Sequence, residues 1–238
     1  MPILAYILTA LAAYLLGSIP TGYLLGRAKG VDLRTVGSGN IGATNAMRAL
    51  GKPLGILVLL ADALKGYVAC RFLPRLICNW LAPHFSGFFR PFQDTPFEFQ
   101  IRFYVVAGVF AVLGHNYTCW LKFKGGKGVA TTTGVCAVLV PWPLLIGLAV
   151  FLLALLTTRY VSVGSISAAV ALPVAVWILP PRNALLGVVM TALGALVIYK
   201  HRGNIQRLMA GTENRLGKKS AAQTSGRSSG REIDECGK

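Results

Sequence analysis

Three polar stretches of the sequence combine glycine, amide and hydroxyl side chains with isolated cations. They are VGSGNIGATNAMRALGK at 36–52, GHNYTCWLKFKGGKGVATTTG at 114–134 and YKHRGNIQRLMAGTEN at 199–214. Glycines let backbone amides converge on an oxyanion, and lysine or arginine supplies the opposite charge. The three stretches therefore indicate phosphate-like ligands.

The first stretch matches a dinucleotide-binding fingerprint that its context excludes. Gly37, Gly39 and Gly42 satisfy G-x-G-x-x-G, and Asp62 follows at the expected distance. That fingerprint needs a strand, turn and helix in a parallel sheet, whereas this loop joins two apolar segments of membrane length. We interpret it as an anion-binding loop, with a flexible loop and ordinary helix caps as the alternative. Its further donors are Ser38, Asn40, Thr44, Asn45 and Arg48.

The second stretch is not a Walker A loop. That motif would need glycine where Leu121 stands and a serine or threonine directly after Lys127. Its chemistry still suits phosphate, because exposed amides around Gly126 and one ammonium precede a threonine run at the start of a helix. His115, near the start of this stretch, is interpreted either as a polar interfacial residue or as a catalytic one.

The third stretch sets His201 and Arg202 at the end of the last apolar segment, with Asn204 close behind. Either cation alone would be explained as a helix-dipole partner or a membrane-interface anchor. Together with the other two stretches, it indicates a shared site.

The composition shows what must position these stretches. The 238 residues are 54% hydrophobic and 13% charged, with a mean hydropathy of +0.59, which is typical of a membrane protein and not of a soluble domain. Segments long enough to cross the hydrocarbon, or nearly so, lie at 3–25, 54–72, 103–121, 161–179 and 184–199.

A longer apolar stretch at 129–157 is interrupted by Pro141 and Pro143. The prolines favour a hairpin of two short helices, and a single kinked helix is the alternative. Two crossings here give seven in all. Cations then cluster on one side, so the positive-inside rule predicts an outer N-terminus and a cytoplasmic C-terminus. The predicted fold is an all-α, polytopic bundle of seven transmembrane helices.

The remaining composition adds three expectations. The net charge of +16 is attributed to loops facing anionic headgroups and not to nucleic acid. The five cysteines lack zinc-like spacing, so no metal or cofactor is expected. We predict a membrane domain at 1–216, an aromatic-rich interfacial connection on the outer side at 71–103, and a disordered polar tail at 217–238.

Anion binders on one membrane face suit either an enzyme acting on phosphorylated substrates or a transporter of organic phosphates. A transporter would carry more polar groups and broken helices near mid-membrane. The enzyme is therefore favoured, with the transporter as the alternative.

The chain resembles a known family, the bacterial acyl-phosphate:glycerol-3-phosphate acyltransferases, called PlsY. The resemblance rests on several long matches in order, and it covers most of the chain except 71–103 and the tail. The matching segments are GSIPTGYLLGR, VGSGNIGATNAMRALG, DALKG, GHNYTCWLKFKGGKGVAT and HRGNIQRLMAGTE.

The resemblance implies a seven-helix enzyme of the bacterial inner membrane. It would move a fatty acyl group from acyl phosphate to the 1-hydroxyl of glycerol 3-phosphate, giving lysophosphatidic acid and phosphate. Acyl phosphate, glycerol 3-phosphate and membrane lipid are the expected partners, with no obligatory protein partner.

The residues can supply two substrate subsites and a catalytic base for that reaction. We expect Ser38, Arg48, Lys127 and Asn204 to hold glycerol 3-phosphate. Acyl phosphate is assigned to Gly37, Gly39, Asn40, Gly42, Thr44, Gly126 and Ser165, although helix capping is an equal reading for the serine. The base is His201, His115 or an oxygen of the acyl phosphate, with His201 ranked first.

Overall fold

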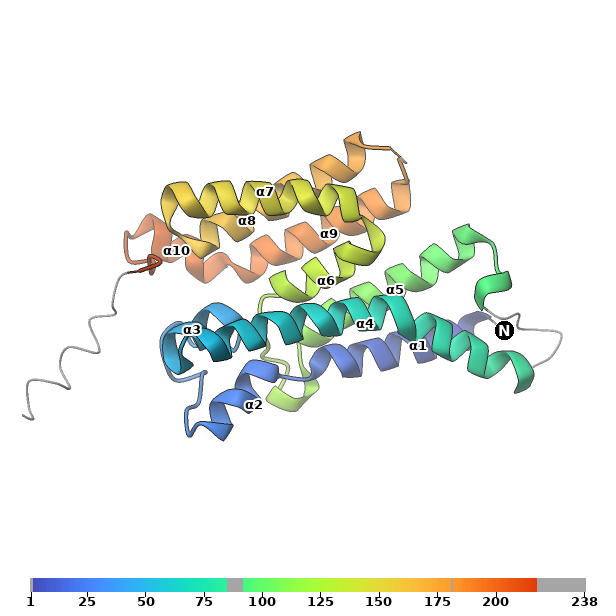
Figure 1. Ribbon diagram of the computed structural model, residues 1–238, viewed down its shortest axis with the longest axis horizontal. Helices are drawn as coiled ribbons and strands as arrows, with labels where there is room; N and C mark the ends of the chain where they lie inside the picture. The colour runs from blue at the N-terminus through green and yellow to red at the C-terminus, as the bar shows by residue number, and fades with distance from the viewer. Residues whose placement is uncertain (1, 85–91, 181, 218–238) are drawn as a thin grey trace, which may run out of the picture.

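The structure is a computed structural model that describes residues 2–84, 92–180 and 182–217. These residues form helices and connections without a β-strand. Figure 1 shows the long helices lying side by side, with the short helices α2, α3 and α10 at one end. The helices are α1 (Pro2–Ser18), α2 (Thr21–Ala28), α3 (Ala43–Leu50), α4 (Lys52–His84), α5 (Phe97–Asn116), α6 (Val129–Leu139), α7 (Pro141–Thr158), α8 (Val161–Ile178), α9 (Ala184–Lys200) and α10 (Arg202–Met209), with 3-10 turns η1 (Phe92–Asp94) and η2 (Cys119–Leu121).

Two groups of long helices make up the bundle. In one, α1 packs against α4 and α5; in the other, α7 packs on α8 and α8 on α9. The short helix α6 lies between them, against α4, with smaller contacts to α5, α7 and α9. Close approach depends on glycine: a Cβ at Gly17 of α1 would lie 2.1 Å from the Ala111 carbonyl oxygen of α5.

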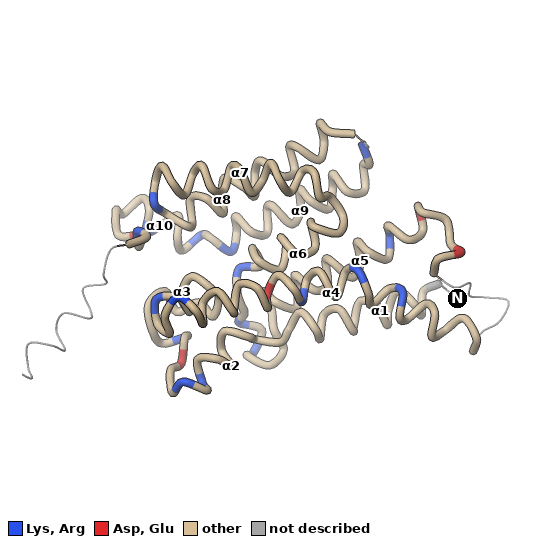
Figure 2. The backbone as a smooth tube through the Cα atoms, viewed as in Figure 1, with Lys and Arg blue, Asp and Glu red and all other residues tan. Residues whose placement is uncertain are grey.

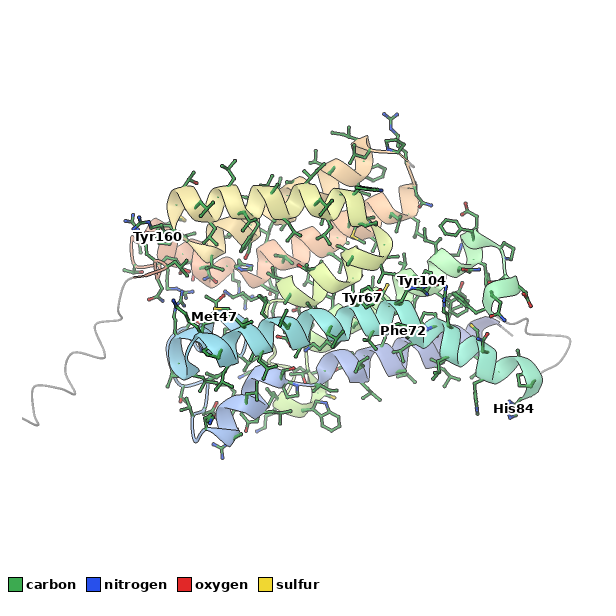
Figure 3. The ribbon with its side chains drawn as sticks, viewed as in Figure 1. Met47, Tyr67, Phe72, His84, Tyr104 and Tyr160 are labelled. Carbon is green, nitrogen blue, oxygen red and sulfur yellow. The ribbon has the colours of Figure 1, made fainter. Side chains whose placement is uncertain are left out.

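The exposed surface of the long helices suits lipid. Four helical segments are long and apolar enough to cross a membrane, or five if α9 and α10, bent by 52°, count as one. Figure 3 shows side chains projecting outward along α7, where Leu153 and Leu156 are 65% and 77% exposed. The structure thus supports an all-helical membrane protein, while seven crossings and their orientation stay predictions.

The first apolar segment is broken, although a single helix was expected at 3–25. α1 ends at Ser18 and α2 begins at Thr21. Pro20 lies in the break, where it has no amide to continue the helical hydrogen bonds. The Lys65 ammonium of α4 donates to the Ile19 carbonyl oxygen at 2.9 Å, which ties the break to the bundle.

Most of the segment predicted as an interfacial connection at 71–103 is helical. α4 continues to His84 and α5 begins at Phe97, because the aromatic residues pack instead of spreading over the membrane surface. Phe103 is fully buried and stacks on Tyr6 at 3.9 Å between ring centroids. Residues 85–91 lie outside the described residues, as do 218–238 of the predicted tail, and the outer placement stays a prediction.

The apolar stretch at 129–157 forms two helices, as the prolines predicted. The break falls at Val140, and Pro141 opens α7, a position where the missing amide costs no helical hydrogen bond. α6 has 11 residues, hence a length of about 16 Å, too short to cross the hydrocarbon alone.

The helix α3 folds back onto the start of α4. A Cβ at Gly55 of α4 would lie 2.0 Å from the Met47 Cγ of α3, so only glycine allows this approach; Met47 is labelled in Figure 3. The packing holds the N-terminal end of α3 over the interior of the bundle.

Candidate active site

A cavity open to solvent lies where the three polar stretches meet. Its walls come from α3 to α8 and from the junction of α9 and α10. The residues singled out from sequence that line it are Ser38, Asn40, Gly42, Thr44, Arg48, His115, Lys127, Ser165, His201 and Asn204. Segments more than 150 residues apart in the chain therefore share one site, which we call the active-site cavity.

Three helix N-termini face the active-site cavity. α3, α6 and α8 begin after Gly42, Gly128 and Tyr160, and none of the three has a side-chain cap. The first-turn residues Ala43, Val129 and Val161 line the cavity. Uncapped first turns leave backbone N–H groups without partners at the positive end of the helix dipole. The cavity is thus built to attract an anion.

Lys127 supplies an ammonium between these helix ends. Its Nζ donates to Asn204 Oδ1 of α10, which links the glycine loop to the third polar stretch. Burial, together with repulsion from Arg207 and Arg48, lowers the pKa of Lys127 to about 8, against an opposing attraction from Glu213. An anion bound here would raise the pKa of Lys127 again, because it favours the charged form.

Glu213 organises one wall of the active-site cavity, a role not predicted from the sequence. Its Oε1 accepts hydrogen bonds from Asn204 Nδ2 at 2.7 Å and Ser162 Oγ at 3.0 Å, and its Oε2 accepts one from Arg207 Nε at 2.8 Å. These hydrogen bonds lower the pKa of Glu213 despite its burial. A signal was available, because Glu213 is the sole carboxylate in a stretch with three cations, Lys200, Arg202 and Arg207.

Arg48 reaches the active-site cavity from the far end of α3. Burial lowers the pKa of its guanidinium, partly offset by Glu213, but arginine remains charged at all physiological pH values. Its planar fork can hold two oxygens of one phosphate.

The imidazole of His201 is held in one orientation. Nδ1 lies 2.8 Å from the Val197 carbonyl oxygen, and because a carbonyl only accepts, Nδ1 donates. Burial and the nearby Lys127 lower the pKa of His201, which follows the last residue of α9, to about 4. Its Nε2 therefore carries a lone pair and can accept a proton from a hydroxyl in the cavity.

His115 lies deeper, at the end of α5. Its Nδ1 is 3.7 Å from Asp62 Oδ1, and Lys65 Nζ is 2.8 Å from the same oxygen. Asp62 and Lys65 thus form a buried ion pair. A Cβ at Gly126 would lie 2.0 Å from His115 Nε2, so the ring supports the glycine loop while one side of it lines the cavity.

Gly37, Gly39 and Gly126 do not line the active-site cavity, contrary to expectation. The amides of Gly39 and Gly126 donate within the protein, to Val36 O and His115 O, so they are not free for a ligand. Gly37 and Gly39 instead adopt φ values of +58° and +68°, which glycine alone adopts at no steric cost. These glycines shape the loops. Sequence alone could not reveal which amides the fold would already use.

An apolar groove adjoins the active-site cavity and shares Val129, Phe151 and Ser165 with it. Each of its four helices contributes residues at i, i+3, i+4 and i+7, so one face of each lines the groove. These residues are 129, 132, 133 and 136 of α6; 144, 147, 148 and 151 of α7; 165, 168, 169, 172 and 173 of α8; and 190, 193, 194 and 197 of α9. A polar site thus adjoins an apolar groove suited to an alkyl chain.

Comparisons with known proteins agree with this site. The family model described as glycerol-3-phosphate acyltransferase matches residues 7–211. Curated proteins of that name from Geotalea daltonii and Geobacter sulfurreducens are 45% and 48% identical, over 87% and 88% of this chain and 96% of each relative. The crystal structure of PlsY, an integral membrane glycerol 3-phosphate acyltransferase, in its glycerol 3-phosphate form is 40% identical with a TM-score of 0.74, over 89% of this chain and 96% of that chain. Its lysophosphatidic acid form is 37% identical with a TM-score of 0.70, over 89% and 95%.

Proposed function

The chain belongs to the glycerol-3-phosphate acyltransferase family, and on this premise we propose that its acyl donor is acyl phosphate. The enzyme acylates glycerol 3-phosphate, and in the proposed reaction the products are lysophosphatidic acid and inorganic phosphate. One observation carries the choice of donor: the anion-attracting cavity, with three uncapped helix N-termini, adjoins the apolar groove. A fatty chain that ends in an acyl group esterified to phosphate fits this junction.

We assign glycerol 3-phosphate to the side of the active-site cavity that holds Ser38, Arg48, Lys127 and Asn204. Lys127 and Arg48 belong to different polar stretches, and both line this cavity. Their charges would neutralise a phosphate dianion, and the amide of Asn204 would fix its orientation.

Acyl phosphate would lie across the mouth of the groove. Ser165 belongs to both cavities, although its hydroxyl also donates to Val161 O at 2.9 Å. Asn40, Gly42 and Thr44 stand at the α3 N-terminus, where the donor phosphate would meet the positive end of the helix. Gly37, Gly39 and Gly126 keep a supporting role as loop formers.

The chemical step needs no covalent enzyme intermediate. The 1-hydroxyl oxygen attacks the acyl carbonyl carbon, the bond from that carbon to the phosphate oxygen breaks, and phosphate leaves with its electron pair. The hydroxyl proton passes to His201 Nε2 or to an oxygen of the acyl phosphate. His115, with Asp62 on one side and Gly126 on the other, is the weaker candidate. Positioning two substrates in this way can contribute about 7–11 kcal/mol to lowering the barrier.

We propose seven crossings of the bacterial inner membrane, with the active site on the cytoplasmic face. The chain leaves the active-site cavity along α6, which begins at Val129, and comes back along α7, because the first residues of α8 line the cavity again. It leaves once more along α8 and comes back along α9, which is followed by His201. Together with α1 and the earlier pair α4 and α5, these two pairs of helices support seven passes, an odd number. The excess of cations beside this cavity supports a cytoplasmic face. Residues 1–216 would form one domain that acts without a cofactor or an obligatory protein partner.

Purified protein tests the proposal directly. With acyl phosphate and labelled glycerol 3-phosphate in detergent, we expect stoichiometric release of phosphate and a labelled lysolipid. A transporter of organic phosphates, which the comparisons do not favour, would leave both compounds intact and would need sealed vesicles. Transfer from an acyl thioester but not from acyl phosphate would refute the proposed donor.

A further inference from the structure

A second polar cavity, which we call the antechamber, adjoins the active-site cavity on the side away from the groove. It opens to solvent and shares Ser38, Asn40, Lys127 and Asn204 with the active-site cavity. None of the residues lining the apolar groove lines it. The active-site cavity therefore adjoins a polar cavity that opens to solvent on one side and an apolar groove on the other.

The antechamber is cationic. Lys200, Arg202 and Arg207 line it together with Lys127, and no carboxylate is among its lining residues. Figure 2 shows the cationic positions at the end of α9 and along α10. Within the part of the chain that the structure describes, Arg207 is the one of these four cations that pairs with a carboxylate. The walls thus carry an unbalanced positive charge.

Two of these cations are held in place by neutral groups. Lys200 Nζ donates to Asn116 O at 3.0 Å and lies 4.6 Å from the centre of the Tyr117 ring, while the Arg202 guanidinium lies 4.6 Å from that of Tyr199. A carbonyl or a ring orients a cation without cancelling its charge. The charges are therefore fixed and remain available to a passing anion.

We propose that the antechamber binds the phosphate of glycerol 3-phosphate before this substrate reaches Lys127 and His201, whereas acyl phosphate enters by the groove. The inference rests on the proposed function. A pocket lined by one sign of charge raises the local concentration of its counter-ion and speeds association, and salt weakens the effect. The antechamber should therefore affect the capture of one substrate only.

Two substitutions change the antechamber with little risk to the fold. Arg202→Gln removes a charge from an exposed side chain, and Gln206→Glu adds a carboxylate of the same shape at an exposed lining position. Lys124→Gln and Ala210→Glu make the same charge changes at exposed positions outside all three cavities. Lys200 is left intact because it also holds the end of α5.

Steady-state kinetics in detergent, with each substrate varied in turn, tests the proposal. For both antechamber variants at low salt we expect kcat/KM for glycerol 3-phosphate to fall about three- to tenfold. The kcat value and the KM for acyl phosphate should stay within about twofold of wild type, and the deficit should shrink near 0.5 M salt, as the Debye length becomes short.

The two control variants distinguish a local binding site in the antechamber from a general effect of the protein's positive charge. Equal losses in Lys124→Gln and Ala210→Glu would overturn the proposal, as would equal losses for the two substrates or a loss confined to kcat. Absence of any transfer from acyl phosphate by the wild-type protein would refute the proposed function itself, and the antechamber proposal with it.

Discussion

The charge state of Lys127 makes the strongest test of the active-site assignment. In the empty site its pKa is about 8, against 10.5 for a free lysine. The difference corresponds to about 3 kcal/mol of penalty on the charged form, chiefly from burial. A bound phosphate dianion would remove much of that penalty, so the free enzyme and the complex should titrate differently.

We therefore expect kcat/KM for glycerol 3-phosphate to fall tenfold per pH unit above about pH 8, because it reports ionisation of the free enzyme. The corresponding decline in kcat should occur at higher pH, because the bound phosphate favours the ammonium. Between pH 8 and 10.5 the unfolded chain binds more protons at this residue than the folded protein does. This residue's contribution to the free energy of unfolding therefore rises with pH in that window, so the lost activity would not reflect unfolding through Lys127.

Substitution identifies the titrating group. Lys127→Arg keeps a cation that does not titrate, so the variant should be slower but should lose the decline near pH 8. Lys127→Ala should lower kcat/KM by about 10- to 150-fold, since hydrogen bonds to charged groups contribute about 1.5–3 kcal/mol. The assay is phosphate release from pH 6.5 to 9.5 with folding followed by thermal unfolding. An unchanged decline near pH 8 in Lys127→Arg would refute the assignment.

Three further substitutions test other parts of the site. Arg48→Ala should lower kcat/KM at least tenfold with unchanged thermal stability. Lys52 is exposed at the start of α4, so the control Lys52→Ala should have little effect. Normal turnover in Arg48→Ala would exclude a contact between Arg48 and phosphate. His201→Ala should lower kcat by about 10²- to 10⁴-fold at saturating substrate, and a change confined to the KM for glycerol 3-phosphate would rule it out as the base. Gly126→Ala should lower both the unfolding temperature and kcat/KM, because the added Cβ would lie 2.0 Å from His115 Nε2. The control Gly203→Ala should be tolerated, because the atom nearest to its added Cβ would be 3.6 Å away.

The sequence predicted which loops would meet because loop charge and segment length are local properties. The three polar stretches needed only a common membrane face to converge, and Arg48, Lys127 and His201 indeed line one cavity. The break at Val140 was also predictable, since Pro141 cannot continue a helix from the preceding turn. Features of this kind depend on a few neighbouring residues.

The features that were missed depend on packing between distant segments. The carboxylate of Glu213 gains its role only when α8 and α10 place Ser162, Asn204 and Arg207 around it. The aromatic run after Arg71 looked interfacial because composition does not tell a buried ring from one at the membrane surface. Phe103 became buried because Tyr6, almost a hundred residues earlier, stacks on it.

The arrangement of helix ends explains how one site can serve a water-soluble substrate and a lipid-soluble one. α6 is too short to cross the hydrocarbon alone, so its uncapped N-terminus lies inside the bundle, beside the groove that α7, α8 and α9 complete. An anion drawn to that helix end is therefore drawn to the groove mouth as well. With a full-length helix at this position, the positive helix end and the alkyl channel would be separated by about a further 13 Å, the rise of some nine residues. The short helix is thus the feature of the fold that brings the phosphate chemistry and the acyl chain together.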